Sequence, residues 1–310
     1  MNYSNRFRVK PGSKVDLGKV DASFRDKHES HEHALPEIEA YSQKLHDLQY
    51  LMYAEGKRSL LICLQGRDAA GKDGTINHVL GAMNPQGCPV TGFKVPSKEE
   101  AAHDFLWRYH QHTPARGQVA IFNRSHYEDV LVVRVHNMVP KQVWSRRYEH
   151  INNFEKLLYD NGTHILKFYL HIDAEEELER FKMRIDDSAR HWKISDGDYA
   201  ERPFWDAYTG AFEDALSKCS TEHAPWFIIP SNHKWFRNLA ISRIVSETLE
   251  SLDMKFPEPS VDINEIKKKY HAIVEEEGGG EKAELEEQAN SGKEKKGKKS
   301  KKGKQGKKGK

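Results

Sequence analysis

The chain has 310 residues, of which 31% are charged and 37% hydrophobic, enough apolar material for one large α/β domain with shorter extensions. The formal net charge is +2, but residues 291–310 hold eleven lysines and one glutamate, which leaves 38 basic and 46 acidic residues in the rest of the chain. This acidic body excludes a basic nucleic-acid-binding domain as the main folded part.

Cysteine usage and hydropathy limit the class of protein further. The three cysteines, Cys63, Cys88 and Cys219, are too few and too widely spaced for a disulfide framework or a zinc site. We expect no signal peptide, because the first residues lack an apolar core, and no membrane span, because no apolar run is long enough. The sequence therefore predicts a cytoplasmic protein.

Three parts are expected along the chain. Residues 1–33 contain Pro11-Gly12 and no sustained periodicity, which indicates an N-terminal arm. Residues 34–258 are predicted to form the main domain, and residues 259–310 a C-terminal extension. From about residue 278 the extension is rich in lysine and poor in apolar residues, so we predict disorder there. This tail is either a solubilising extension or an electrostatic tether for a polyanion, and salt-sensitive retention lost on truncation after Glu287 would indicate a tether.

Helix and strand patterns alternate through the main domain. Apolar residues recur at helical spacing from Pro36 to Tyr53, with Pro36 expected in the first turn. Apolar runs predict strands at 60–64, 90–95, 118–123, 164–172 and 226–229. Further helices are expected at 97–110, 141–159, 173–185 and 235–252, the first of them opened by a Ser97/Glu100 capping box. The alternation predicts an α/β fold with a parallel sheet covered by helices on both faces.

The first predicted strand runs directly into a glycine-rich loop. Gly66, four further residues and Gly71-Lys72 are followed by helix-forming residues, the order of a phosphate-binding P-loop. Glycines let backbone N–H groups approach phosphate oxygens, the helix N-terminus adds its positive end, and the lysine neutralises charge. The predicted phosphate-binding loop residues are Gly66, Arg67, Ala69, Ala70, Gly71, Lys72, Asp73 and Gly74. Asp73 stands where the usual pattern has Ser or Thr, so we expect a carboxylate, at Asp73 or Asp68, to replace the hydroxyl in organising magnesium.

A second polar cluster follows the strand predicted at 118–123. It comprises Asn123-Arg124-Ser125 and then Tyr127-Glu128-Asp129. Because ligands gather at the carboxyl ends of parallel strands, this tip is expected beside the glycine loop, with Arg124 toward phosphate oxygens. Glu128 is expected either to orient a magnesium-bound water or to repel a surplus phosphate. The alternative is a polar helix start with a capping role.

Basic residues recur between Leu178 and Pro203. They are Arg180, Lys182, Arg184, Arg190, Lys193 and Arg202. Such a run is either a solvated face or, in a P-loop kinase, a helical lid whose cations close over the transferred phosphoryl group. We predict a lid at about 175–205.

Taken together, these motifs resemble those of the family 2 polyphosphate kinases. The resemblance covers about residues 34–254 and is carried by GRDAAGKDGT (66–75), NPQG (84–87), AHDFLWR (102–108), FNRSHYEDVLVVRVH (122–136), RHWK (190–193), the stretch 205–216, WFIIPS (226–231) and KWFR (234–237). It implies a P-loop kinase-like three-layer fold and an enzyme that transfers the terminal phosphoryl group between polyphosphate and a nucleotide. AMP and ADP are the implied acceptors, with GDP a third candidate; Mg²⁺ is the implied cofactor, with Mn²⁺ as a substitute. A dimer or tetramer of identical chains is also implied.

The resemblance and the charge pattern together assign site residues. Asp68, Lys72, Arg124, Glu128 and Arg184 are expected to be catalytic, with Asp68 and Glu128 placing the metal. Nucleotide binding is expected from Asp68, Asn123, Tyr127, Glu128, Arg184 and Lys193. Polyphosphate binding outside the loop is expected from Lys94, Arg124, Arg134, Arg180 and Lys193. Two rival functions stay open at this point: an ATP-dependent nucleoside monophosphate kinase, and a non-catalytic P-loop protein that binds polyanions.

Overall fold

The structure, a computed structural model, describes residues 2–277. The chain divides into two compact units, Met1–Phe256 and Pro257–Lys310. In the second unit a helix spans 263–277, and the Asp262 carboxylate accepts a hydrogen bond from the Asn264 N–H at 2.8 Å at its start. The tail predicted to be disordered from about residue 278 lies outside the described residues. Within them, no helix combines the length and the apolar character that crossing a membrane requires.

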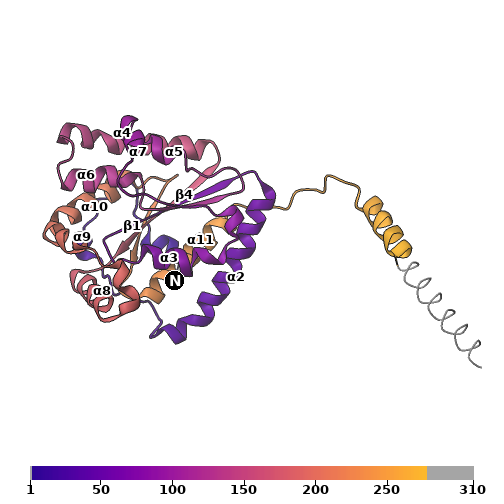
Figure 1. Cartoon of the computed structure of the whole chain (residues 1–310), viewed down its shortest axis with the longest axis horizontal. Helices are drawn as coiled ribbons and strands as arrows, with labels where there is room; N and C mark the ends of the chain where they lie inside the picture. Colours follow the sequence, from indigo (N-terminus) through magenta and orange to yellow (C-terminus); the bar gives the residue numbers. More distant parts are fainter. Residues whose placement is uncertain (1, 278–310) are drawn as a thin grey trace, which may run out of the picture. The chain divides into compact units, whose positions relative to one another are not determined.

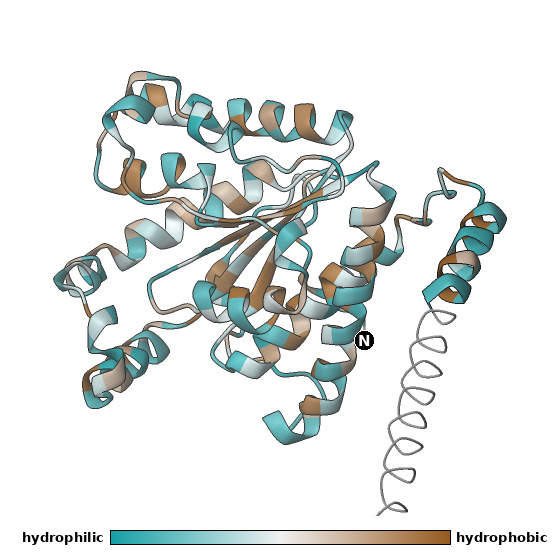
Figure 2. Cartoon of the chain, turned by 45° about the vertical axis from the view of Figure 1, so that its right-hand side comes forward, coloured by the Kyte–Doolittle hydropathy of each residue, from teal (hydrophilic) through white to brown (hydrophobic). Residues whose placement is uncertain are grey.

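A five-stranded parallel sheet forms the centre of the first unit (Figure 1). Its order is β2-β3-β1-β4-β5, with β1 at Ser59–Gly66, β2 at Val90–Gly92, β3 at Val119–Asn123, β4 at Thr163–His171 and β5 at Trp226–Pro230. All the ladders are parallel, so the carboxyl ends of the strands share one edge. Apolar side chains concentrate in these strands (Figure 2), as expected when both faces of a sheet are covered.

Helices cover both faces of the sheet, which confirms the predicted three-layer α/β fold (Figure 1). Alternate residues of β1 separate the layers: Leu60, Ile62 and Leu64 join one core, and Leu61 and Cys63 another. The first core contains residues of α1 (Tyr3–Phe7), α2 (His31–Glu55), η2 (Leu80–Ala82) and α11 (Lys234–Glu250). The opposite face is covered by α5 (Trp107–His110), α6 (Val132–Val135), α7 (Lys141–Asp160) and α10 (Trp205–Cys219).

The first 33 residues pack within the same compact unit. Tyr3 and Phe7 are buried in one core, and Leu17, in the 3₁₀ segment η1 (Leu17–Lys19), belongs to the other. The Val9 N–H donates to the Trp226 carbonyl at 2.8 Å, so this segment covers the free edge of β5. Covering an edge strand satisfies its unpaired backbone groups and removes a site of aggregation.

The helix predicted at 36–53 begins earlier than expected. The Ser30 hydroxyl accepts from the His33 N–H, and α2 runs from His31 to Glu55. Pro36 therefore lies in the second turn, not in the first as predicted, at the loss of one intrahelical hydrogen bond. Apolar spacing and the proline placed the helix start at Pro36, whereas the Ser30 cap, six residues upstream, sets it.

The segment after the glycine loop also differs in detail. The predicted strand at 90–95 is shorter, since β2 ends at Gly92. The Ser97/Glu100 capping box is present, but the helix predicted at 97–110 is two helices, α4 (Lys98–Ala102) and α5. The break comes at His103, whose backbone is extended, and the Asp104 carboxylate accepts from the Leu106 N–H at 3.0 Å. An aspartate that caps its own turn competes with a continuous helix.

The remaining elements follow the predicted order. α7, β4 and β5 match the prediction within one residue at each end, and α11 begins one residue and ends two residues earlier than predicted. Asp173 caps α8 (Ala174–Asp186), accepting from the Glu176 N–H at 2.8 Å. The other short elements are α3 (Lys72–His78), η3 (Pro85–Gly87), η4 (His126–Val130), η5 (Ser188–Lys193), α9 (Asp196–Ala200) and η6 (Arg202–Phe204).

Candidate active site

The glycine loop between β1 and α3 encloses its own lysine. Lys72 is 9% exposed, and its ammonium donates to the carbonyls of Gly66 at 2.8 Å and Arg67 at 3.0 Å. Left-handed backbone at Ala69 (φ 56°) and Gly71 (φ 106°) turns the chain tightly between them. These two hydrogen bonds hold the loop around its cation, so the lysine is fixed before any phosphate binds.

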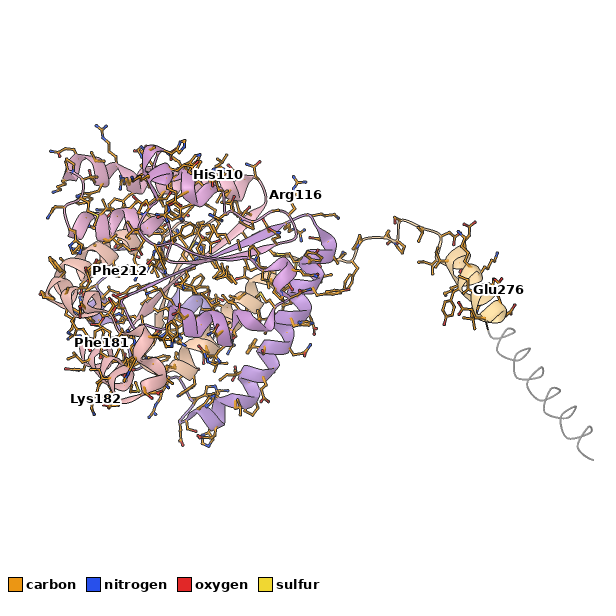
Figure 3. The ribbon with its side chains drawn as sticks, viewed as in Figure 1. His110, Arg116, Phe181, Lys182, Phe212 and Glu276 are labelled. Atoms are coloured by element: carbon orange, nitrogen blue, oxygen red, sulfur yellow. The ribbon has the colours of Figure 1, made fainter. Side chains whose placement is uncertain are left out.

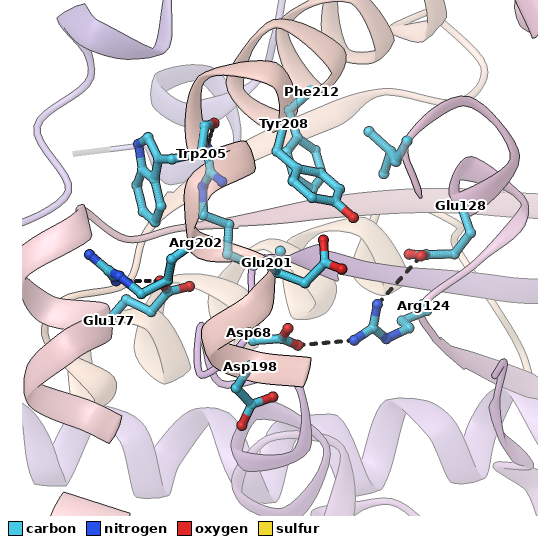
Figure 4. A pocket seen from close by; sticks show the side chains of 13 residues that line it. Asp68, Arg124, Glu128, Glu177, Asp198, Glu201, Arg202, Trp205, Tyr208 and Phe212 are labelled. Atoms are coloured by element: carbon cyan, nitrogen blue, oxygen red, sulfur yellow. Dashed lines mark hydrogen bonds and ion pairs between the residues drawn. The ribbon is translucent and has the colours of Figure 1, made fainter. Parts of the chain in front are cut away.

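The polar tip of β3 lies beside this loop, as the sequence predicts. Leu64 of β1 is paired with Asn123 of β3, so the two strands end side by side. Arg124, in a left-handed conformation (φ 63°), places its guanidinium between two carboxylates, Asp68 at 3.0 Å and Glu128 at 3.4 Å (Figure 4). The Asn123 amide donates to Asp73 Oδ1 at 2.8 Å. The loop and the tip are therefore joined by two side-chain contacts, Arg124 with Asp68 and Asn123 with Asp73.

The charges of this cluster influence one another. Burial lowers the pKa of Lys72 to about 8, and repulsion by Arg124 adds to the effect, although Asp68 and Glu128 oppose it. Burial opposes the charged form of Arg124 as well, but Glu128 and Asp68 raise its pKa above the ordinary value. A buried lysine next to an arginine favours binding of an anion, because an anion would relieve the repulsion between the two cations.

A buried ionic network supports the tip from below. His126 Nε2 lies 3.0 Å from Glu155 Oε1, and the Lys167 ammonium donates to Glu155 Oε2 at 2.5 Å, all three side chains being fully buried. Tyr127, predicted to bind nucleotide, is fully buried in this network, and its hydroxyl donates to Glu155 at 2.9 Å. The structure therefore does not bring the Tyr127 side chain to the glycine loop, because this side chain packs in the core against Lys167 of β4.

One cavity lies on the carboxylate side of the loop (Figure 4), and we call it the acidic cavity. It is lined by Gly66, Arg67, Asp68, Arg124, Glu128, Leu131, Glu177, Asp198, Glu201, Arg202, Trp205, Tyr208 and Phe212. The Arg67 guanidinium stacks 3.5 Å from the centre of the Trp205 ring and donates to Thr209 Oγ1 at 2.6 Å. Aromatic rings beside carboxylates make a cavity of mixed apolar and hydrogen-bonding character, which suits a small organic ligand that carries donors.

A second, larger hollow borders later residues of the same loop, and we call it the cationic cleft. Its volume is about 640 Å³, and its lining includes Gly71, Asp73, Gly74, Arg180, Arg184, Arg190, Lys193, Lys234 and Arg237. Among the described residues, six Lys or Arg side chains and one carboxylate line it. A smaller hollow of about 250 Å³ shares Arg184 with the cationic cleft and Asp68 and Arg124 with the acidic cavity, and it also contains Lys94. The three hollows therefore meet at the loop.

The predicted lid contributes cations to the cationic cleft. Arg184 of α8 donates to Asp198 Oδ2 at 2.8 Å, and η5 supplies Arg190 and Lys193. The structure thus brings Arg184 and Lys193 together with the loop, as predicted. Arg180, one turn before Arg184, is different: it is 4% exposed and bonds protein carbonyls of the loop.

Arg134, predicted to bind polyphosphate, lies on α6 away from these hollows. Its guanidinium donates to Asp214 at 2.6 Å and to the Tyr148 hydroxyl at 3.1 Å, and it lies 4.6 Å from the centre of the Trp144 ring. The charge pattern of the sequence could not reveal this, because Asp214 is 80 residues distant and α10 brings it close.

Sequence reasoning missed several residues of the cationic cleft. Lys234 and Arg237, at the start of α11, line it although they are more than 150 residues from the loop. Arg237 is 2% exposed, and its guanidinium fills the space beside Gly71, where an added Cβ would lie 1.7 Å from Nη1. The signal available was their position after β5, at the carboxyl edge of the sheet where ligands gather.

Comparisons with known proteins place the chain in a family. The sequence model of the family described as Polyphosphate kinase 2 (PPK2) matches residues 27–257. An AMP/ADP-polyphosphate phosphotransferase of Meiothermus ruber is 47% identical over 255 residues, 82% of this chain and 96% of that protein. An ADP-polyphosphate phosphotransferase of Rhodopseudomonas palustris is 45% identical, over 82% of this chain and 92% of that protein.

A solved structure supports the same family assignment. The crystal structure of polyphosphate kinase 2 from Arthrobacter aurescens superimposes with a TM-score of 0.84 at 39% identity, covering 89% of this chain and 97% of that one. Family model, sequence relatives and solved structure all cover the region that holds the glycine loop, the β3 tip and the cationic cleft. The chain therefore belongs to the polyphosphate kinase 2 family.

Proposed function

We propose that the protein transfers the terminal phosphoryl group of inorganic polyphosphate to AMP and ADP. The observation that carries this proposal is that one phosphate loop borders two different hollows, the acidic cavity through Gly66, Arg67 and Asp68 and the cationic cleft through Ala69, Gly71, Asp73 and Gly74. Polyphosphate carries about one negative charge per phosphate, so its binding requires spaced cations and no base-recognition pocket. A nucleotide requires a cavity with aromatic and hydrogen-bonding groups, and the acidic cavity supplies both. The names of the relatives support the same donor and acceptors.

The transfer itself requires positioning and charge neutralisation. A terminal phosphate oxygen of the nucleotide attacks the terminal phosphorus of polyphosphate, a new P–O bond forms, and the bond to the shortened polyphosphate breaks. We assign Lys72 and Arg124 to the oxygens of the transferred group, because both residues line the smaller hollow, which shares residues with the acidic cavity and with the cationic cleft. Arg184 and Lys193 close from the lid side. No covalent protein intermediate is needed, since the attacking oxygen is already anionic.

The donor set beside Arg124 fits a hard divalent cation. Asp68 and Glu128 offer carboxylate oxygens, whereas among residues 2–277 no cluster of three or more His, Cys, Asp or Glu side chains is placed to hold a metal ion. Mg²⁺ is commonly bound by one or two carboxylates with substrate phosphates completing the shell, and this arrangement suits it; Mn²⁺ takes similar ligands. We therefore propose that Asp68 and Glu128 hold Mg²⁺ with the substrates, where it would neutralise phosphate charge. Asn123 is assigned to the nucleotide side.

The wider organisation is proposed on the same basis. We propose a lid at about 175–205, a homo-oligomer of two or four chains, and a cytoplasmic location, where nucleotides are available and thiols such as the buried Cys63 stay reduced. The Lys-rich tail is proposed to contact polyanions. Light scattering on the full chain, and heparin retention with and without residues 288–310, measure the oligomer and the tail separately.

The decisive experiment uses two donors. The purified full chain is mixed with Mg²⁺ and either polyphosphate or ATP, and with AMP, ADP or GDP, and the products are resolved by chromatography; K72M is the matched control. We expect products from polyphosphate with AMP and ADP, and at least a tenfold loss in K72M. Equal rates with ATP as donor would indicate a nucleoside monophosphate kinase. Polyphosphate binding without any transfer would indicate a non-catalytic protein.

A further inference from the structure

We propose that Arg180 is a positioning residue, which fixes the backbone of the phosphate loop instead of binding phosphate itself. The kinetic part of this inference depends on the proposed function. Its structural part does not, and the closing measurement is chosen for that reason.

The hydrogen bonds of Arg180 carry the argument. Its Nη1 donates to the carbonyls of Ala69 at 2.8 Å and Ala70 at 3.0 Å, and its Nε donates to Glu176 at 2.6 Å. Its Nη2 donates to the carbonyls of Ser231 and Asn232, in the segment after β5. A guanidinium has five N–H donors, and five acceptors surround this one. In this arrangement Arg180 has no donor left for a phosphate oxygen, although it faces the cationic cleft.

The carbonyls that Arg180 holds control where the loop amides point. The C=O and N–H of a trans peptide group point in opposite directions, and the described residues contain no cis peptide bond. Holding the Ala70 carbonyl against Arg180 therefore directs the Gly71 N–H away from α8. The Ala70 N–H, opposite the Ala69 carbonyl, donates to the Arg67 carbonyl at 3.2 Å, whereas among the described residues no hydrogen bond uses the Gly71 N–H. Such an unpaired loop amide is the kind of group with which a phosphate loop binds its ligand.

The loop is also strained at the point that Arg180 contacts. Ala69 has a positive φ of 56°, a conformation that residues with a Cβ rarely adopt and keep only when the surroundings enforce it. The neighbouring carbonyl is held from a second side by Arg237, whose Nη1 donates to Ala70 at 3.3 Å. The loop therefore keeps its shape through contacts from α8 and α11.

Burying Arg180 beside Arg237 lowers the stability of the fold, so we expect this arrangement to serve the site. Arg180 and Arg237 are 4% and 2% exposed; burial lowers the pKa of both guanidinium groups, and the charge of Arg180 lowers that of Arg237 further. Two adjacent buried cations destabilise a fold, but they add positive potential where an anion binds. Because Arg180 anchors the first half of α8, the loop and the lid helix that carries Arg184 are fixed to one another at this residue.

Steady-state kinetics with matched variants give the first test. Arg180→Met and Arg180→Lys are compared with Arg116→Met, which removes an exposed arginine before β3 (Figure 3). We expect R180M to lower kcat by about 100-fold with less than about a threefold change in the KM for polyphosphate, since a misplaced loop reduces the rate more than the binding. R180K should recover part of the loss, and R116M should match the wild type. A tenfold rise in KM at unchanged kcat would show direct phosphate binding and overturn the proposal.

Hydrogen exchange supplies the readout that needs no activity. In the ligand-free full chain, we expect the amides of residues 66–75 to exchange about tenfold faster in R180M than in the wild type, with β1 and β4 unchanged. Unchanged exchange in 66–75 would refute the positioning role. Equal acceleration throughout the sheet would show a general loss of stability, which also overturns it. A wild-type chain that transfers no phosphoryl group would reject the proposed function and leave this measurement valid.

Discussion

Arg124 and Asp68 meet across the ends of β3 and β1, with Nη2 of the arginine 3.0 Å from Oδ1 of the aspartate. The arginine side chain is 40% exposed, so this ion pair contributes little to stability. Its consequence is geometric: the contact sets the tip of one strand against the phosphate loop of the next, and it places a cation next to Lys72.

Replacing Arg124 tests its assignment to the transferred group. R124M should lower kcat by about 100- to 1000-fold, which corresponds to about 3–4 kcal/mol, because a preorganised donor to the developing charge is lost. The measurement is the rate of nucleotide phosphorylation at saturating polyphosphate. R116M, which removes an exposed arginine before β3, is the control (Figure 3). More than a tenth of the wild-type rate in R124M would contradict the assignment.

The sequence and the structure assign different roles to Arg134: the sequence predicts polyphosphate binding, and the structure pairs this residue with Asp214 and Tyr148. Its ion pair with Asp214 and its contact with Tyr148 lie on α6, α7 and α10, so we expect R134M to lower the melting temperature. The kcat/KM for polyphosphate should stay within about threefold of the wild type, because charge at a distant, screened site has little influence on the cleft. Calorimetry and initial rates measure the two effects. A selective loss of polyphosphate affinity at unchanged melting temperature would instead restore Arg134 as a ligand.

The hydrogen bond between Asn123 and Asp73 predicts that substituting one partner lowers activity and that exchanging both residues restores part of it. N123D would bring two carboxylates together where the amide now donates at 2.8 Å, and the repulsion should reduce activity by about tenfold. In the double variant D73N/N123D the donor and acceptor are exchanged, so part of the activity should return. The coupling from the four rates is expected to be about 1 kcal/mol. Additive losses would show that the two side chains act independently.

The lowered pKa of Lys72 predicts an alkaline limb in the rate profile. Since burial and Arg124 bring this pKa to about 8, the ammonium that we assign to phosphate is complete well below pH 8, half lost at pH 8 and lost as the pH rises further. The kcat/KM, which reports on the free enzyme, should therefore fall about tenfold for each pH unit above 8. For stability the sign is opposite: the unfolded chain holds the proton up to about pH 10.4, so Lys72 makes folding more favourable as the pH rises between these values. A flat kcat/KM to pH 9.5 would contradict the prediction.

The buried network below the β3 tip predicts a large change in stability. Lys167 donates to Glu155, to the Tyr127 hydroxyl at 2.8 Å and to the Cys219 carbonyl at 2.7 Å. K167M would leave the Glu155 charge buried without its partner, and the free energy of unfolding should fall by about 3–5 kcal/mol. Urea unfolding measures it, and the double variant K167M/E155Q should recover part of the loss. A change below about 1 kcal/mol would show that Glu155 is neutral or reached by water.

The sequence by itself determined the features that depend on neighbouring residues. The apolar run before Gly66 and the glycines around Lys72 predict strand, loop and helix in that order, and parallel strands place the β3 tip beside them. Serine and aspartate caps, as at Asp173, are equally local, because a side chain bonds a backbone group three residues away. The fold class, the loop and the Arg124 position follow from such short-range rules.

Only the tertiary structure decided which of several similar side chains serve the site. Arg180 and Arg184 are equivalent by helical spacing, yet one donates to loop carbonyls and the other to Asp198. Arg134 is paired with Asp214, and Tyr127 is buried in the core. Arg237, which is far from the loop in the sequence, lies beside Gly71. The physical reason is common to all of them: a charged side chain takes the partner that satisfies its hydrogen bonds, and distant segments supply that partner only when the chain is folded.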